Sequence, residues 1–313
     1  MENLLKVLPQ YFLIFSLVLA LTYLGIRIRN SSKLFMPKEY KIIKKIINKI
    51  SSKNNLGEYP LTFTIVAGNR TYWIGKALGI CQKEESCYFI KNINPFVPYK
   101  GRFAEELNEA IRQTYLLNTI EAYAWPNGTI AISRSSFKNN ERKEDYLAFV
   151  IGHEISHILN QDSFNNSLKK YKDGEGLKAK KKELLGYKLS RKSETKADID
   201  SARMLINAGY KKETPIEAHD FIAKLGGYGY ITEKESSHPG YEDRRSKLKS
   251  FLKKYKNDES SYLSKQITKG SWIFNRKENT LTYQIKSSVI RTAKSEDDPN
   301  SLAKYFDGQI IKN

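Results

Sequence analysis

The amino-acid sequence predicts an α+β fold that is mainly helical and carries a small antiparallel sheet. Long central stretches repeat apolar residues at the spacing of an amphipathic helix, and shorter β-branched and aromatic runs are bounded by turn residues. With 313 residues, 40% of them hydrophobic, the chain can bury a sizeable core. We divide it into an N-terminal membrane anchor (1–29), a lead-in with an amphipathic helix and strands (30–100), a core (101–256) and a C-terminal β-hairpin extension (257–313).

The first part, residues 1–29, predicts a membrane anchor. The stretch from Val7 to Ile26 contains no charged residue and is bracketed by Lys6 and Arg27. A helix needs about 20 apolar residues to cross the hydrocarbon core of a bilayer. A cleaved signal peptide would have a shorter apolar region and a small-x-small cleavage site, and the best candidate, at residues 20–22, fits poorly. We therefore expect an uncleaved, single-pass anchor.

Two observations point to opposite sides of the membrane for the domain that follows. Positive charges at Arg27, Arg29 and Lys33 come directly after the anchor, and the positive-inside rule then favours a cytoplasmic domain. Cys81 and Cys87 could close a small disulfide loop, which needs an oxidising compartment, although two free thiols fit nearly as well. We place the domain on the periplasmic or envelope side and keep the cytoplasmic side as the alternative.

The charge balance is strongly basic, with 53 Lys+Arg against 34 Asp+Glu and a net charge of +19. Such a surplus attracts acidic partners, either anionic lipid or nucleic acid. The lysines are spread along nearly the whole chain, however, and no basic arm or aromatic-interleaved patch stands out. We therefore expect no specific nucleic-acid partner.

The lead-in combines one helix with strands. Isoleucines recur at helical spacing opposite a lysine face over residues 39–50, which predicts an amphipathic helix. Residues 61–68 and 71–80 are rich in β-branched and aromatic side chains, which predicts two strands joined by a turn at Asn69-Arg70.

In the core, residues 102–117 predict a helix and residues 121–133 predict two short strands around a Pro-Asn-Gly turn. The strongest helical pattern covers residues 143–162. It places Leu147, Ile151 and Ile155 on one side and His153 and His157 on the other. Farther along, residues 168–192 predict an exposed loop or loose helix, residues 193–210, 215–225 and 241–255 predict helices, and residues 271–285 predict a hairpin.

The sequence HEISH, residues 153–157, matches the pattern H-E-x-x-H. Residues four apart lie on the same face of a helix, so His153 and His157 can bind one metal ion, with Glu154 beside them to take a proton from an attacking water. The alternative is a helix that spells this pattern by chance. Because two of the four histidines in the chain lie here, we prefer a catalytic zinc site with one Zn²⁺ per chain.

A third protein ligand must come from elsewhere in the chain. Asn160 and Ser163 stand where the metzincin pattern needs Gly and His, which excludes that class. Glu194 lies on a later predicted helix with Asp198 one turn on, so Glu194 can bind the metal while Asp198 hydrogen-bonds a ligating histidine. By position alone, Glu175 and Glu183 are rivals for the ligand role.

Four separated pieces of the sequence occur in the order of one peptidase family. They are EAYAWPNGTIAIS from residue 121, LAFVIGHEISHIL from residue 147, SETKADIDSARMLINAGY from residue 193 and SSHPGYEDR from residue 236. The chain thereby resembles the membrane-associated zinc peptidases typified by HtpX, the CAAX prenyl proteases and the OMA-type quality-control peptidases. This resemblance implies a zincin-type (gluzincin) metallopeptidase domain over the core.

The resemblance also implies roles for further residues. His238 matches a histidine that stabilises the oxyanion, and Arg244 matches an arginine that is structural or paired with an acid such as Asp198. The segment around Tyr123 matches the strand that pairs with the substrate backbone; its expected substrate-binding residues are Tyr123, Ala124, Trp125, Gly128 and Ile130. Glu121 and Asn127 depart from the family's usual Asn and Gly, so substrate preference is expected to differ.

These inferences predict an endopeptidase that hydrolyses peptide bonds of unfolded or damaged membrane or envelope proteins. Its partners would be protein or peptide substrates and, through the N-terminal helix, a membrane. The alternative is a peptidase-fold chaperone or scaffold that binds clients with little or no cleavage. A third reading is a basic membrane-surface or nucleic-acid module that holds no zinc. The sequence leaves the oligomeric state open.

Overall fold

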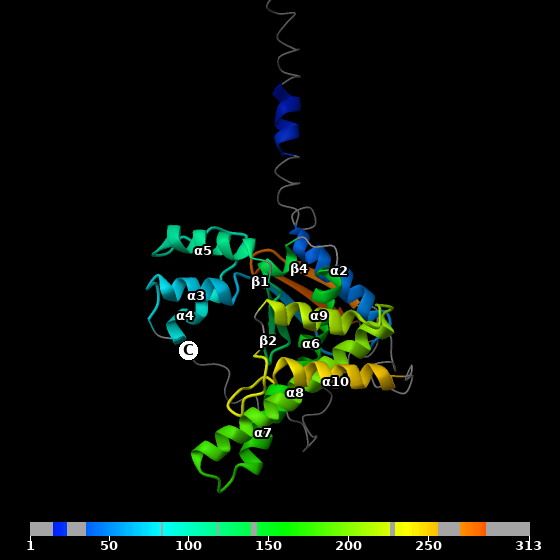
Figure 1. The fold of residues 1–313 in the computed structure, drawn as a ribbon. Helices are drawn as coiled ribbons and strands as arrows, with labels where there is room; N and C mark the ends of the chain where they lie inside the picture. Colours follow the sequence, from blue (N-terminus) through cyan, green and yellow to red (C-terminus); the bar gives the residue numbers. More distant parts are fainter. Residues whose placement is uncertain are drawn as a thin grey trace, which may run out of the picture.

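The structure of the chain is a computed structural model that describes residues 15–23, 36–82, 84–117, 119–138, 143–225, 229–255 and 270–285. Figure 1 shows the arrangement of its elements. The helices are α2 (Lys38–Ser51), α3 (Asn69–Ala77), α4 (Glu84–Lys91), α5 (Ala104–Leu116), α6 (Lys143–Leu159), α7 (Asp162–Asp173), α8 (Ala179–Asn207), α9 (Thr214–Lys224) and α10 (Tyr241–Lys254). The strands are β1 (Leu61–Val66), β2 (Ala122–Ala124), β3 (Thr129–Ser133), β4 (Gly270–Asn275) and β5 (Thr280–Ile285), and a 3₁₀ turn covers Arg134–Phe137.

The five strands form one sheet in the order β2-β3-β1-β5-β4. β1 and β3 are parallel, with Phe63 opposite Ile130, and the other three pairings are antiparallel. The prediction of an antiparallel sheet is therefore wrong for this pair. The connection permits this arrangement: α3, α4 and α5 separate β1 from β2 and β3, and parallel strands need a long crossover of this kind.

The expected strand over residues 71–80 is also wrong, because this segment is mostly α3. Gly68, with φ of 96°, turns the chain after β1, and the backbone N–H of Asn69 then donates to both carboxylate oxygens of Glu121. Thr71, Tyr72 and Gly75 are buried at helical spacing. Tertiary contacts thus override the β-branched and aromatic composition, and the lead-in contains a single described strand, β1.

The structure gives the form of two further segments. Residues 168–192 are largely helical, within α7 and α8. The expected hairpin is present as strands β4 and β5, and β5 pairs with β1, so residues 270–285 add two strands to the sheet. Residues 286–313 of the predicted extension lie outside the described residues.

The core lies between the sheet and the helices α2, α6, α8 and α9. On α2, Ile43, Ile46, Ile47 and Ile50 are fully buried, as the amphipathic pattern predicts. Helix α6 carries apolar side chains into this core from the face opposite its histidines. In Figure 1, α3, α4 and α5 lie together on one side of the sheet, while α7 and the adjoining end of α8 project from the body.

A disulfide joins Cys81 to Cys87, with 5.2 Å between their Cα atoms. It connects the segment after α3 to α4, and Gly75 lets these helices approach closely, since a Cβ there would lie 2.8 Å from Ile90 Cδ1. The two short helices therefore form one cross-linked unit beside the sheet.

The described part of the N-terminal segment, residues 15–23, is helical and exposed. Among the described residues, no helix combines the length and the apolar character needed to cross a membrane. The expected anchor from Val7 to Ile26 lies largely outside the described residues, so it stays a prediction.

Gly152 allows α6 and α8 to pack closely. A Cβ at this position would lie 2.6 Å from Ser201 Oγ, and that hydroxyl donates to the carbonyl of Phe149 at 2.6 Å. We expect Gly152→Ala to destabilise the protein by about 1–3 kcal/mol, because the overpacked side chain cannot move without losing its hydrogen bond.

The matched control for this prediction is Gly186→Ala on α8. There the added Cβ would meet only the flexible end of Lys170, at 3.2 Å, and alanine favours a helix over glycine by about 1 kcal/mol. Chemical unfolding of both variants measures the difference. Equal stability of the two variants would show that Gly152 does not limit the packing of α6 against α8.

Candidate metal centre

Two helices supply the residues of the H-E-x-x-H site. His153 and His157 lie one turn apart on α6, and their Nε2 atoms are 3.0 Å apart. Helix α8 packs against α6 and brings Glu194 to both rings, 3.3 Å from His153 Nε2 and 3.5 Å from His157 Nε2. These three residues can place their ligand atoms within 4.8 Å of one another. The rivals by position, Glu175 and Glu183, are not in this group.

Both imidazoles are held by carboxylates on their far side. His153 Nδ1 lies 2.9 Å from Asp198 Oδ1, and His157 Nδ1 lies 2.7 Å from Asp162 Oδ2. With Nδ1–H donating to a carboxylate, each Nε2 presents a lone pair to the shared point, which is the usual support for a metal-binding histidine. Asp198 takes the position expected from the sequence, whereas Asp162 was not anticipated.

The spacing of these donor atoms fits a tetrahedral metal ion. Two ligands at the usual zinc–nitrogen distance of about 2.0–2.1 Å are about 3.3 Å apart. The two Nε2 atoms are 3.0 Å apart, His153 Nε2 lies 3.3 Å from Glu194 Oε2, and His157 Nε2 lies 3.5 Å from Glu194 Oε1. His153, His157 and Glu194 could therefore hold a metal ion.

The electrostatics of the cluster favour a bound cation. Burial lowers the pKa of His153, but hydrogen bonds to Asp198 and Glu194 outweigh it and raise this pKa to about 10. Burial likewise lowers the pKa of His157, and contacts with Asp162 and Glu194 raise it to about 9. The carboxylates that stabilise a proton on these rings would equally stabilise a metal ion between them.

Glu194 and Asp198 remain ionised despite burial. Burial raises the pKa of Glu194, but hydrogen bonds from the histidines hold it well below its usual range. Burial acts in the same direction on Asp198, but the charge of Arg244 together with hydrogen bonds from His153 and Arg244 holds its pKa below the usual range. Arg244 is buried and donates to both Asp198 oxygens, at 2.8 and 2.6 Å. The expected pairing of Arg244 with Asp198 is therefore present.

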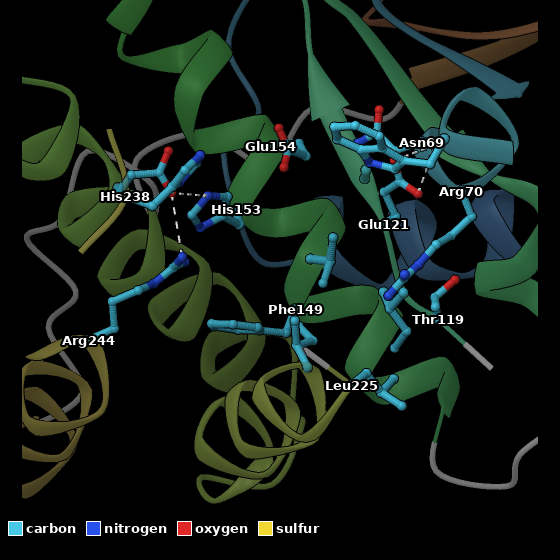
Figure 2. A pocket seen from close by; sticks show the side chains of 16 residues that line it. Asn69, Arg70, Thr119, Glu121, Phe149, His153, Glu154, Leu225, His238 and Arg244 are labelled. Carbon is cyan, nitrogen blue, oxygen red and sulfur yellow. Dashed lines mark hydrogen bonds and ion pairs between the residues drawn. The ribbon is translucent and has the colours of Figure 1, made fainter. Parts of the chain in front are cut away.

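Glu154 lines the cleft beside the metal-binding group without belonging to it. It is buried, and burial raises the pKa of its carboxyl group, partly offset by the two histidines. A hydrogen bond from the backbone of Ala124 also fixes its carboxylate. Figure 2 shows this side chain next to His153 and apart from the dashed contacts among His238, Arg244 and the cluster. The position of Glu154 suits a general base better than a metal ligand.

His238 lies on the loop before α10, and its Nδ1 is 3.1 Å from Glu194 Oε2. Its side chain is 60% exposed, so a substrate in the cleft can reach it. Ser236 fixes the local backbone, because its hydroxyl accepts from the N–H of His238 and donates to the carbonyl of the same residue.

The expected substrate-binding residues fall into two groups. Tyr123, Ala124 and Trp125 line the cleft, and β2 is the terminal strand of the sheet on this side. Gly128, with φ of 83°, lies in the turn, and Ile130 is fully buried on β3. Ile130 belongs to the hydrophobic core and is not among the residues that line the cleft, so its role in substrate binding stays a prediction.

The cleft continues on both sides of the metal-binding group. One half has a volume of about 470 Å³ and is lined by residues of α3, α6 and α9, including Arg70, Trp73 and Phe149, as Figure 2 shows for the labelled side chains. The other half lies along β2 toward α4, α7 and α8. Sequence reasoning missed α3 and α4 as walls of the cleft, since it assigned part of this segment to a strand.

Comparison with known families adds an independent finding. The model of Peptidase family M48 matches residues 105–172. The match supports a relationship between this part of the chain and the M48 metallopeptidases. It covers α5, the strands β2 and β3, and α6 and α7, including His153, Glu154 and His157, whereas Glu194, His238 and Arg244 lie beyond it. No curated protein and no solved structure matched the chain.

Proposed function

We propose that the chain is a zinc-dependent endopeptidase that hydrolyses peptide bonds of unfolded or damaged membrane or envelope proteins. The observation that carries the proposal is the convergence of His153 Nε2, His157 Nε2 and Glu194 on one point, with Glu154 lining the same cleft. The match to Peptidase family M48 supports the same chemistry.

His153, His157 and Glu194 would hold the zinc ion. When bound, zinc supplies a Lewis acid that polarises the scissile carbonyl and makes water a stronger nucleophile. Glu154 would take the proton from the attacking water and later return it to the leaving amine. Asp198 and Asp162 would keep both imidazoles in the ligating tautomer, and each contacts its histidine directly.

The remaining residues would bind and orient the substrate. Strand β2 ends the sheet, so an extended peptide can pair with its outer edge through main-chain hydrogen bonds, a mode that tolerates many sequences. His238, exposed beside Glu194, would donate to the oxyanion as it develops. Pairing of this kind requires an extended segment, which favours unfolded or damaged substrates.

The proposed location is a membrane, with the domain on the periplasmic or envelope side. The disulfide between Cys81 and Cys87 supports that side, because disulfides persist in oxidising compartments. The uncharged run from Val7 to Ile26 supplies the proposed single-pass anchor.

The test uses the full-length chain in detergent. We expect one zinc per chain and cleavage of an unfolded protein such as casein. A strong zinc chelator should abolish cleavage, while a non-chelating analogue should not. The chelator should also lower the free energy of unfolding by about 3 kcal/mol. The reference is protein kept at a free-zinc concentration about 100 times Kd, because zinc binds only the folded site.

Two other outcomes would contradict the proposal in different ways. Stoichiometric zinc without cleavage of any unfolded protein would point to a chaperone or scaffold that binds clients. A chain that purifies without zinc, and whose stability added zinc leaves unchanged, would exclude the metal site.

A further inference from the structure

Two arginines line the half of the cleft next to α3 and α9. Arg244 is buried and engaged with Asp198 and Glu194. Arg70 is exposed, and within the described part of the chain no hydrogen bond or ion pair of its side chain is present. In Figure 2 the side chain of Arg70 extends along the cleft toward Thr119. The cleft therefore contains a guanidinium available to a ligand.

The nearby carboxylate of Glu121 is already used by the backbone. Both its oxygens accept from the N–H of Asn69, at 2.9 and 3.2 Å. Burial raises the pKa of Glu121, and the charge of Arg70 contributes to lowering it, so the two groups sense each other without forming an ion pair. Glu121 acts as a support for the start of α3 and leaves the Arg70 fork open.

The backbone that carries Arg70 is fixed from several directions. Gly68 N–H donates to the carbonyl of Lys91 at 2.8 Å, and Thr71 Oγ1 donates to Thr114 Oγ1 on α5 at 2.9 Å. The disulfide follows shortly after the other end of the helix. A rigid helix holds the backbone of a binding residue in one position, and selective recognition depends on such fixed placement.

The walls around Arg70 combine apolar and polar side chains. Phe149 and Ile222 are buried, and Trp73, which is 58% exposed, stands beside the cleft on the same helix as Arg70. The planar fork of an arginine binds a carboxylate through two parallel hydrogen bonds.

We propose that Arg70 is a specificity-determining residue that recognises a substrate carboxylate at one position on the α3 side of the scissile bond. The carboxylate belongs to an aspartate or glutamate side chain or to the C-terminus of a peptide. Figure 2 shows Arg70 on the other side of the cleft from His153 and Arg244, so we expect the preference at a substrate position next to α3. The proposal rests on the proposed peptidase function and adds a substrate class to it.

The test measures kcat/KM of the full-length protein in detergent on peptides that vary one position at a time. At one position, we expect Asp or Glu to exceed Asn or Gln by about tenfold, as for a charge-assisted hydrogen bond. Arg70→Met should remove this preference, and Arg70→Glu should reverse it toward Lys or Arg. Peptides ending in a free acid or an amide separate a C-terminal carboxylate from an acidic side chain.

The matched control is Lys76→Met, which removes a positive charge from an exposed position of the same helix outside the residues that line the cleft. It should keep the preference of the unmutated protein. If Arg70→Glu retains the same preference, or if the unmutated protein shows none at any position, the proposal is overturned.

A direct binding measurement separates this proposal from the peptidase function itself. The Glu154→Gln protein keeps the ligand set, so fluorescence anisotropy can compare labelled acidic peptides with their amide counterparts without turnover. If the unmutated protein cuts no peptide, the endopeptidase proposal fails, while about tenfold tighter binding of the acidic peptide still supports Arg70. Equal affinity for both peptides overturns the role of Arg70.

Discussion

Glu154→Gln is expected to lower kcat/KM for an unfolded substrate by about 10²–10⁴-fold, the usual contribution of a positioned general base. The amide has nearly the shape of the carboxylate, but it cannot take a proton from water. Because Glu154 lies outside the group of candidate ligands, the variant should still bind one zinc per chain. Zinc analysis and casein cleavage, measured on the same preparation, test both parts of this expectation.

Glu144→Gln is the matched control for this prediction. Glu144 lies in the first turn of the same helix and pairs with the exposed Lys45, a kind of ion pair worth at most about 1 kcal/mol. We expect its zinc content and its kcat/KM to equal those of the unmutated protein. Unchanged cleavage by Glu154→Gln would remove Glu154 from the reaction, and loss of zinc would make it a ligand instead of a base.

The centre of the site could be predicted because its geometry is local. His153 and His157 are four residues apart on a strongly patterned helix, and Glu194 and Asp198 have the same spacing on another. Sequence spacing alone then brings each pair onto one face. The contact between α6 and α8, which brings the two pairs together, is not local. It could be expected only because the order of the motifs resembles that of a known family.

Asp162 could not be predicted in this way, because it depends on how α6 ends. Gln161 adopts a left-handed conformation with φ of 50°, which starts α7 and returns the Asp162 side chain to His157 at 2.7 Å. A left-handed residue is expected at Gly or Asn, and Gln161 gives no such signal. The turn is visible only in the folded chain.

The error at α3 had a wider effect, since it also concealed a wall of the cleft. The N–H of Asn69 is held by Glu121, 52 residues away, and no local pattern contains that contact. With α3 read as a strand, Arg70 stood in a turn and the crossover between β1 and β3 could not be recognised. One misassigned segment therefore altered both the sheet topology and the account of the site.

Arg244→Met is expected to destabilise the protein by about 3–5 kcal/mol, the usual cost of breaking a buried ion pair from one side. Arg244 and Asp198 are 3% and 2% exposed, and the arginine donates to both carboxylate oxygens. Without it, Asp198 would remain buried with its Oδ1 against His153 Nδ1. We also expect about 10–100-fold weaker zinc binding, since Asp198 would no longer be held against its histidine.

Arg245→Met, at the adjacent residue, is the matched control for Arg244→Met. Arg245 pairs with Asp220 through hydrogen bonds of 2.7 and 3.0 Å, but these side chains are 26% and 27% exposed, so Arg245→Met should cost no more than about 1 kcal/mol. Chemical unfolding with and without zinc separates folding from metal binding. If both variants lose equal stability, the burial of Arg244 and Asp198 does not decide how much their ion pair contributes to stability.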